Sequence, residues 1–140
     1  MKFQKFKRSL GFTLLEVLIV TLIMGILTGI ATIGYQKYVY RAHRTEAKAV
    51  LLDISQRAER FYTDNNTYSG YTVPQSLSAV PQQGTATYTV SYNAINDGQG
   101  FTVTAAPSGR QVKDTCGTLS INNIGRKTAS GSPSGEARCW

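Results

Sequence analysis

The stretch RSLGFTLLEVLIVTLIMGILTGIATI (residues 8–33) decides how this chain is built. Residues 12–33 form an almost uninterrupted apolar run in which Glu16 is the single charge. As a helix rising about 1.5 Å per residue, this run reaches about 33 Å, which is enough to cross the hydrocarbon core of a bilayer. The sequence therefore predicts one membrane-spanning helix near the N-terminus.

A short basic leader precedes the apolar run. Its four cations, with no acidic residue among them, are Lys2, Lys5, Lys7 and Arg8. The positive-inside rule then predicts a cytoplasmic N-terminus, with the rest of the chain on the other side of the membrane. A cut between Gly11 and Phe12 would remove only this leader. An ordinary secretory signal is instead cut beyond its apolar region.

Glu16 is the anomaly in the apolar run, because an unpaired carboxylate in lipid costs about 3 kcal/mol or more. One interpretation is that Glu16 lies near the headgroups and is hydrated there. The other is functional. If the chain is cut before Phe12, the new amine lies one helical turn from Glu16, and the carboxylate could also pair with the amine of another subunit.

The segment KRSLGFTLLE (residues 7–16) closely resembles the class III signal of type IV prepilins and pseudopilins. The resemblance implies that a prepilin peptidase/N-methyltransferase cuts after Gly11 and methylates the amine of Phe12. It also implies that Glu16 helps the subunit dock onto a growing helical fibre of other pilin subunits. The implied partners further include an inner-membrane assembly platform. The implied location is the inner membrane before assembly and the extracellular pilus, or fimbrium, afterwards.

Length and charge place bounds on the rest of the chain. Of 140 residues, about 105 follow the membrane segment, which is enough for one modest domain. The formal net charge of +7 is concentrated near the N-terminus, since residues 63–140 carry five basic and four acidic side chains. A nearly neutral exported part gives little support to a nucleic-acid-binding surface from bulk charge alone.

The two cysteines, Cys116 and Cys139, both lie in the exported part, where a pair of this kind is most simply a disulfide. Closing that loop is worth about 3 kcal/mol in the chain-entropy picture. Two cysteines and the distant His43 are too few ligands for zinc, so no metal site is expected. The sequence holds no catalytic constellation, and we expect neither an enzyme nor a cofactor.

The helix is predicted to continue beyond the membrane, over residues 12–62. Its second half has an apolar stripe at three- and four-residue spacing, formed by Ala47, Val50, Leu51, Ile54, Ala58 and Phe61. Residues 12–73 contain no proline, so any local unwinding of the apolar half must come from Gly25, Gly29 and Gly34.

A basic stretch follows the membrane segment, comprising Lys37, Arg41, Arg44 and Lys48. It could contact lipid headgroups or pair with a neighbouring subunit, or it could be a solvated helix face. Tyr35, Tyr38 and Tyr40 at the same level suit an interfacial aromatic belt.

Strands are predicted in the C-terminal part, after a loop over residues 63–84. Two of them, residues 85–92 and 100–106, flank the turn former Asn-Asp-Gly and make a hairpin. A third is expected over residues 111–121 and a fourth over residues 124–128. Short turns between the strands favour an antiparallel meander.

Two further segments extend the pilin resemblance. RFYTDNNTY (residues 60–68) is similar to the helix exit of pilins, and the Cys-Trp ending resembles that of PilE-like minor pilins. Cys116 and Cys139 match the two cysteines that bound the D-region of the family. The predicted fold is thus α+β, a type IV pilin fold with a long N-terminal helix packed on a small antiparallel sheet. Its parts are the leader (1–11), the membrane and fibre-core half (12–33), the amphipathic half (34–62), the αβ loop (63–84), and the sheet with the D-region (85–140).

The favoured function is a type IV pilus subunit, a minor pilin, acting in assembly, twitching motility, adhesion or DNA uptake. A major pilin and a type II secretion pseudopilin are the alternatives. A third alternative is a pilin that captures DNA through cations near the disulfide: Arg110, Lys113, Arg126, Lys127 and Arg138. The competing interpretation is that these five residues are scattered charges that only keep the protein soluble.

Overall fold

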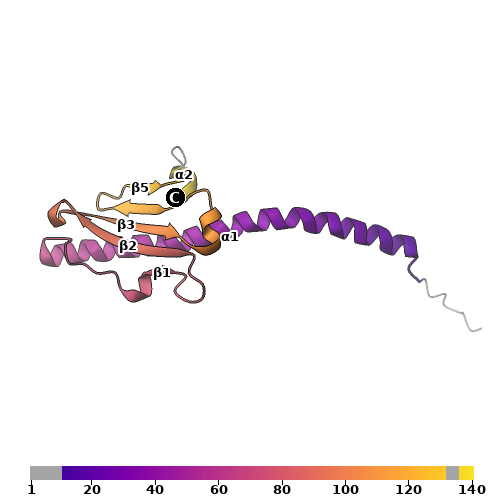
Figure 1. Ribbon diagram of the computed structural model, residues 1–140, viewed down its shortest axis with the longest axis horizontal. Helices are drawn as coiled ribbons and strands as arrows, with labels where there is room; N and C mark the ends of the chain where they lie inside the picture. Colours follow the sequence, from indigo (N-terminus) through magenta and orange to yellow (C-terminus); the bar gives the residue numbers. More distant parts are fainter. Residues whose placement is uncertain (1–10, 132–135) are drawn as a thin grey trace, which may run out of the picture. The chain divides into compact units, whose positions relative to one another are not determined.

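The computed structural model describes residues 11–131 and 136–140 (Figure 1). The predicted leader lies outside the described residues, apart from Gly11. The chain divides into two compact units, residues 1–37 and residues 38–140, and each is described here by itself. We call the second one the head unit.

The principal helix, α1, runs over Leu14–Asn65 and belongs to both units. It therefore starts two residues later and ends three residues later than the sequence predicted. The polar residues at its end extend the helix, because their side chains donate hydrogen bonds to backbone carbonyls four residues earlier. The Thr63 hydroxyl donates to the Glu59 carbonyl at 3.0 Å, and the Asn65 amide donates to the Phe61 carbonyl at 2.9 Å. Asn66 then leaves the helix with a left-handed φ of 53°.

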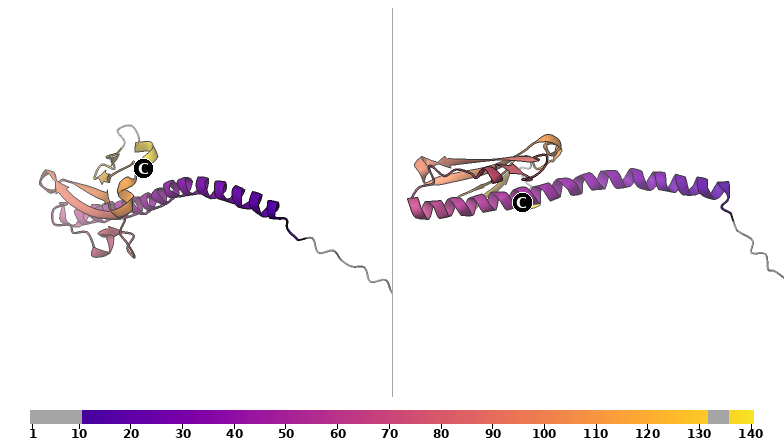
Figure 2. Two further views of the ribbon diagram at one scale, coloured as in Figure 1. Left: turned by 45° about the vertical axis from the view of Figure 1, so that its right-hand side comes forward. Right: turned by 90° about the horizontal axis from the view of Figure 1, so that it is seen from below.

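One face of α1 forms one side of the head unit's core, as the apolar stripe predicted. Ala47, Leu51, Ile54 and Ala58 are completely buried, and Val50 is partly buried against them. The sheet lies along this face of the helix (Figure 2). Burying such side chains contributes about 1.5–3 kcal/mol for each of the larger ones.

The sheet has five strands in the order β1-β2-β3-β4-β5, and all neighbours are antiparallel, which confirms the predicted meander. The strands are β1 (Ala79–Val80), β2 (Tyr88–Ile95), β3 (Gly100–Pro107), β4 (Leu119–Asn122) and β5 (Lys127–Ala129). In β3, Phe101, Val103 and Ala105 are buried and alternate with the more exposed Thr102 and Thr104. This period-two pattern directs one face of the sheet towards the helix.

Three of the predicted segments differ from the observed ones. The first hairpin strand is Tyr88–Ile95, so it begins three residues later and ends three residues later than expected. The predicted loop 63–84 contains a short 3₁₀ helix, η1 (Gln75–Leu77), and the edge strand β1. The reason is that Ala79 and Val80 pair with Thr89 and Tyr88, a partner that local sequence does not reveal. The last strand is Lys127–Ala129 rather than residues 124–128.

The predicted strand over residues 111–121 is correct only for its last three residues and is wrong for residues 111–118. Residues Gly109–Lys113 form a 3₁₀ helix, η3, and β4 starts only at Leu119. Gln111 is 1% exposed because its amide forms hydrogen bonds inside the protein. Gly117 has a left-handed φ of 62°, which an extended strand does not allow. Cys116 consequently lies in a loop and not in a strand.

The remaining elements are short. Asn96–Gly98 form η2 in the β2–β3 turn, and Glu136–Cys139 form the single helical turn α2 at the C-terminus. Tyr68 anchors the loop after α1, since its ring packs edge-on to Phe101 at 5.0 Å and its hydroxyl donates to Glu59 at 2.8 Å. Tyr92 stacks on the same Phe101 ring and donates its hydroxyl to the Tyr68 carbonyl at 3.0 Å.

Candidate functional site

The start of α1 carries the residues that the sequence singled out for processing. Gly11 and Phe12 precede the helix, and the Phe12 side chain is 83% exposed. The Thr13 hydroxyl accepts a hydrogen bond from the backbone N–H of Glu16 at 3.2 Å. Thr13-x-x-Glu16 is the spacing of a capping box, a signal readable in the sequence that the interpretation of Glu16 missed. The acid at this position therefore also suits the beginning of a helix.

The Glu16 carboxylate itself has no hydrogen bond or ion pair to any residue in the described part of the chain. Its surroundings are apolar on all sides of the helix. Every large apolar side chain of residues 12–30 is at least 48% exposed. The helix thus presents an unpaired acid on an otherwise apolar cylinder.

This part of α1 is long and apolar enough to cross a membrane, and its apolar stretch is not buried inside the protein. Two of its threonines are compatible with an apolar environment, because their hydroxyls are bonded within the helix. The Thr21 hydroxyl donates to the Leu18 carbonyl at 2.9 Å, and the Thr28 hydroxyl donates to the Met24 carbonyl at 2.7 Å. Both hydroxyls are therefore satisfied without water.

In the head unit, Cys116 and Cys139 form a disulfide with Cα atoms 5.7 Å apart, which confirms the predicted pairing. The bond joins the loop before β4 to α2. Both sulfur-bearing residues are 3% exposed. The C-terminal segment is thereby closed onto the sheet.

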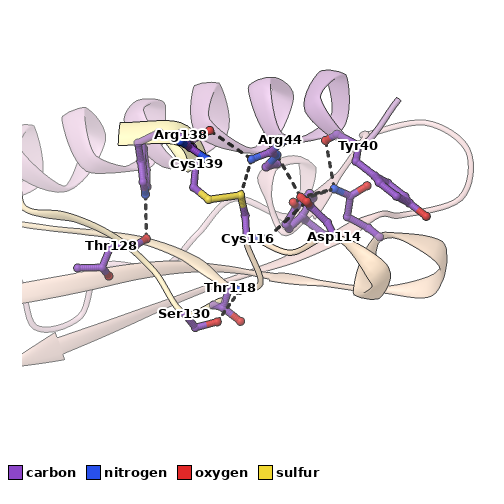
Figure 3. The surroundings of a disulfide bond; sticks show 12 residues. Tyr40, Arg44, Asp114, Cys116, Thr118, Thr128, Ser130, Arg138 and Cys139 are labelled. Atoms are coloured by element: carbon purple, nitrogen blue, oxygen red, sulfur yellow. Dashed lines mark hydrogen bonds and ion pairs between the residues drawn. A yellow bond between two sulfur atoms is a disulfide. The ribbon is translucent and has the colours of Figure 1, made fainter. Parts of the chain in front are cut away.

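Arg44 reaches this disulfide from α1 (Figure 3). Its guanidinium donates to the Sγ atom of Cys116 and, at 3.4 Å, to the carbonyl of Arg138. Its Nε atom lies 3.1 Å from the Asp114 carboxylate. The predictions for Arg44 as a lipid contact, a subunit contact or a solvated cation are therefore not met, because the residue is 8% exposed and bonded within its own chain.

The spacing of Arg44 in the sequence already indicated that this residue is buried. Arg44 stands three residues before Ala47 and seven before Leu51, so it continues the apolar stripe of the helix by one turn. A cation on a buried stripe requires a buried acid as partner. That partner, Asp114, could not be chosen from the sequence.

Gln111 completes the polar cluster below the disulfide. Its amide nitrogen lies within hydrogen-bonding distance of the Tyr40 carbonyl (3.2 Å), the Tyr88 hydroxyl (3.0 Å) and the Asp114 carboxylate (3.1 Å). Through it, η3 is fixed to α1 at Tyr40. The amide is therefore part of the packing of the loop and is directed away from solvent.

A second group of side chains lies at the β5 edge, and we call Lys48, Lys127 and Trp140 the β5-edge cluster. Lys127 lies with its ammonium 5.4 Å from the centre of the Trp140 ring. The Trp140 indole N–H donates to the Thr128 carbonyl at 2.8 Å, which fixes the ring against the strand. Partial burial and the positive charges of Arg44 and Lys127 lower the pKa of Lys48. The Lys127 charge is the smallest of the three effects on Lys48.

The structure brings together only part of the cation group expected near the disulfide. Lys127 lies in the β5-edge cluster, and Arg138 is exposed on α2 beside Cys139. Arg110 and Lys113 are exposed on η3, and Arg126 is exposed at the β4–β5 turn. Lys48, which the sequence did not include, joins from α1. No group of three or more potential metal-ligating side chains occurs among the residues that the structure describes.

Solved structures show the same fold. A type IV pilin from Shewanella oneidensis superposes with a TM-score of 0.56 at 29% identity, covering 72% of this chain and 97% of that one. The Neisseria meningitidis non-core minor pilin PilV gives a TM-score of 0.52 at 22% identity, covering 69% of this chain and 92% of that one. The long helix packed on an antiparallel sheet is therefore the type IV pilin fold.

Two curated relatives match a smaller share of this chain than the solved structures do. The Myxococcus xanthus type IV major pilin protein PilA is 32% identical over 77 residues, which cover 55% of this chain and 34% of the relative. The Dichelobacter nodosus type IV major fimbrial protein FimA is 32% identical over 103 residues, which cover 64% of this chain and 66% of the relative. The match thus spans about a third of the first protein and slightly under two thirds of the second.

Two family models match along the chain. The prokaryotic N-terminal methylation motif matches residues 6–32. The model described as "Type IV minor pilin ComP, DNA uptake sequence receptor" matches residues 34–120, which is more than half of the chain. The chain belongs to this family of type IV minor pilins.

Proposed function

We propose that this chain is a minor subunit of a type IV pilus, held first in the inner membrane with its N-terminus in the cytoplasm and later in the fibre. The observation that carries the proposal is the apolar helix surface over residues 12–30, which is exposed all round and bears one unpaired acid. Neighbouring helices of the same kind would replace lipid around it. Extraction from the membrane then does not require the surface to meet water.

Processing at Gly11–Phe12 fits this arrangement. Both residues precede α1, so a peptidase can reach the bond without unwinding the helix. Cleavage creates an amine at Phe12, one turn from Glu16, and N-methylation keeps its positive charge. Glu16 then pairs with such an amine on a neighbouring subunit, which relieves the cost of an unpaired charge in the fibre core.

The test uses two substitutions at Glu16 and measures how much subunit appears in sheared fibres relative to the membrane. Glu16→Gln keeps a side chain suited to the capping box but removes the charge, whereas Glu16→Ala removes both. We expect both variants to be stable in the membrane and strongly depleted from fibres. Glu46→Ala, at an exposed acid of the same helix, is the control. Normal incorporation of Glu16→Gln would contradict the charge-pairing role.

We propose DNA binding as a second function, because the family model describes a DNA uptake sequence receptor and the head unit has a cationic edge. The β5-edge cluster supplies Lys48 and Lys127, and the exposed Arg126 and Arg138 flank Lys127 and Trp140 in the chain. Asp114, which lies two residues before Cys116, is already paired with Arg44. Lysines at such an edge would contact phosphates, which position a protein on a duplex.

Fluorescence anisotropy with a labelled duplex, measured over a range of salt concentrations, tests this proposal. Lys127→Ala and Arg126→Ala should each weaken binding and reduce the salt slope by about one phosphate contact. Arg60→Ala, an exposed cation at the other end of the helix, should leave both quantities unchanged. Duplex binding that is absent, or equally reduced by Arg60→Ala, would refute a binding surface at the β5 edge.

A further inference from the structure

Arg44 contacts both arms of the chain that carry the disulfide. On one arm it pairs with Asp114 and donates to the Sγ atom of Cys116. On the other it donates to the carbonyl of Arg138, the residue before Cys139. One side chain from α1 thus lies between the two segments that the disulfide joins (Figure 3).

Two of these contacts involve no sulfur atom. The ion pair with Asp114 and the hydrogen bond to the Arg138 carbonyl involve groups that are the same in the reduced chain. Gln111 adds a further attachment of the Asp114 arm, through the Tyr40 carbonyl of α1. The two cysteines can therefore be gathered against the helix before they are oxidised.

The charges around Cys116 differ from those around an ordinary buried thiol. From α1, Arg44 contacts its sulfur, and Lys48 lies within electrostatic range of Arg44. From β5, Lys127 acts on the same Lys48, and from α2 Arg138 contributes its carbonyl. The carboxylate of Asp114 opposes these cations, but it is engaged by Arg44 and accepts from the Cys116 N–H at 3.5 Å. An adjacent cation favours the thiolate form of a cysteine.

We propose that Arg44 makes Cys116 the attacking thiol when the disulfide is formed. The co-reactant is a disulfide oxidant, either a thiol oxidase or oxidised glutathione. The Cys116 thiolate attacks one sulfur of the oxidant, so that a mixed disulfide forms, the oxidant's own bond breaks and half of the oxidant leaves as a thiol. The Cys139 thiolate then attacks the Cys116 sulfur, closes the bridge and expels the second half as a thiol. Two cysteines are oxidised, one disulfide is reduced, and the two cysteine protons pass to the released thiols.

The experiment uses the full chain in detergent micelles with one cysteine at a time. Cys139→Ser retains Cys116, and Cys116→Ser retains Cys139. The rates of mixed-disulfide formation with oxidised glutathione and of alkylation by iodoacetamide are measured against pH. At about pH 7 we expect Cys116 to react at least about fivefold faster than Cys139, with a midpoint at lower pH.

Arg44→Met should remove this advantage, and Arg44→Lys should keep part of it, because a cation remains. Arg41→Met removes an exposed cation one turn earlier and serves as the matched control. Equal reactivity of the two cysteines with Arg44 present would overturn the proposal, and this comparison holds even if Arg44→Met fails to fold. An advantage of Cys116 that persists in a folded Arg44→Met variant would overturn it as well.

Discussion

The Nε atom of Arg44 in α1 lies 3.1 Å from the carboxylate of Asp114 in the loop before β4, and the two side chains are only 10% and 4% exposed. A pair that is this deeply buried has lost most of its hydration, so each charge depends on the other. Because Asp114 lies two residues before Cys116, the pair fixes the disulfide loop to the helix. The stability of the head unit should respond accordingly.

Asp114→Ala should lower the unfolding free energy of the head unit by about 3 kcal/mol, because it leaves the Arg44 guanidinium buried without its counter-charge. Urea denaturation of residues 38–140 measures the change. Replacing both partners at once, with Arg44→Met and Asp114→Leu, should cost less than the sum of the single changes. Asp53→Ala breaks the exposed pair with Arg57 and should have no measurable effect. A loss that is the same at Asp53 and Asp114 would contradict the buried-pair argument.

Reduction of the Cys116–Cys139 disulfide should lower the unfolding free energy by about 3 kcal/mol, given the sequence separation of 23 residues. The physical reason is that the unfolded chain gains the freedom of the opened loop. Urea denaturation with and without reductant measures it. The double variant Cys116→Ala and Cys139→Ala should no longer respond to the reductant, and a response there would point to another target.

The head unit should lose stability above about pH 10. Burial raises the pKa of Tyr68, Tyr88 and Tyr92 to about 12. The ordinary pKa in an unfolded chain is about 10. Between these values the unfolded state releases protons that the folded state retains. The stabilisation is therefore complete below about pH 10 and is lost as the pH rises towards 12.

Denaturation midpoints at about pH 9 and about pH 11 test this directly, and phenolate absorbance follows the ionisation itself. Tyr88→Phe removes one of these three hydroxyls and should reduce the fall in stability between the two pH values. An unchanged midpoint across this range would show that the tyrosines ionise without regard to folding.

Gly98→Ala should be more destabilising than Gly84→Ala, although both residues have a left-handed φ, of 82° and 91°. A methyl group at Gly98 would lie 2.2 Å from the Thr67 hydroxyl, whereas one at Gly84 would meet no atom within 4 Å. Gly84→Ala should lower the unfolding free energy by about 1–2 kcal/mol, the cost of holding a non-glycine residue in the left-handed backbone conformation. Gly98→Ala adds the steric conflict between the β2–β3 turn and the loop after α1. Equal thermal stabilities would show that the turn can move away from Thr67.

Much of this fold is readable in the sequence, because its largest elements follow local periodicity. The apolar run, the stripe from Ala47 to Ala58 and the alternation in β3 each follow from the geometry of a single helix or strand. The meander follows from short turns such as Asn96–Gly98, and the disulfide follows from two cysteines in an exported segment. Glu16 stands out because a lone acid in an apolar helix is rare.

The conformation of the segment from Gly109 to Thr118 depends on tertiary contacts and not on local sequence. A strand was predicted over most of it, yet Gln111 and Asp114 turn inward to meet Tyr40, Tyr88 and Arg44. These partners lie far away in the sequence, and each buried polar group must find one. Sequence alone thus determined the long helix and the β2–β3 hairpin, because local spacing governs them. Only the tertiary structure decided that Arg44 is buried at the disulfide and that Lys48 joins Lys127 at the β5 edge, because charge pairing inside a protein depends on which distant segments meet.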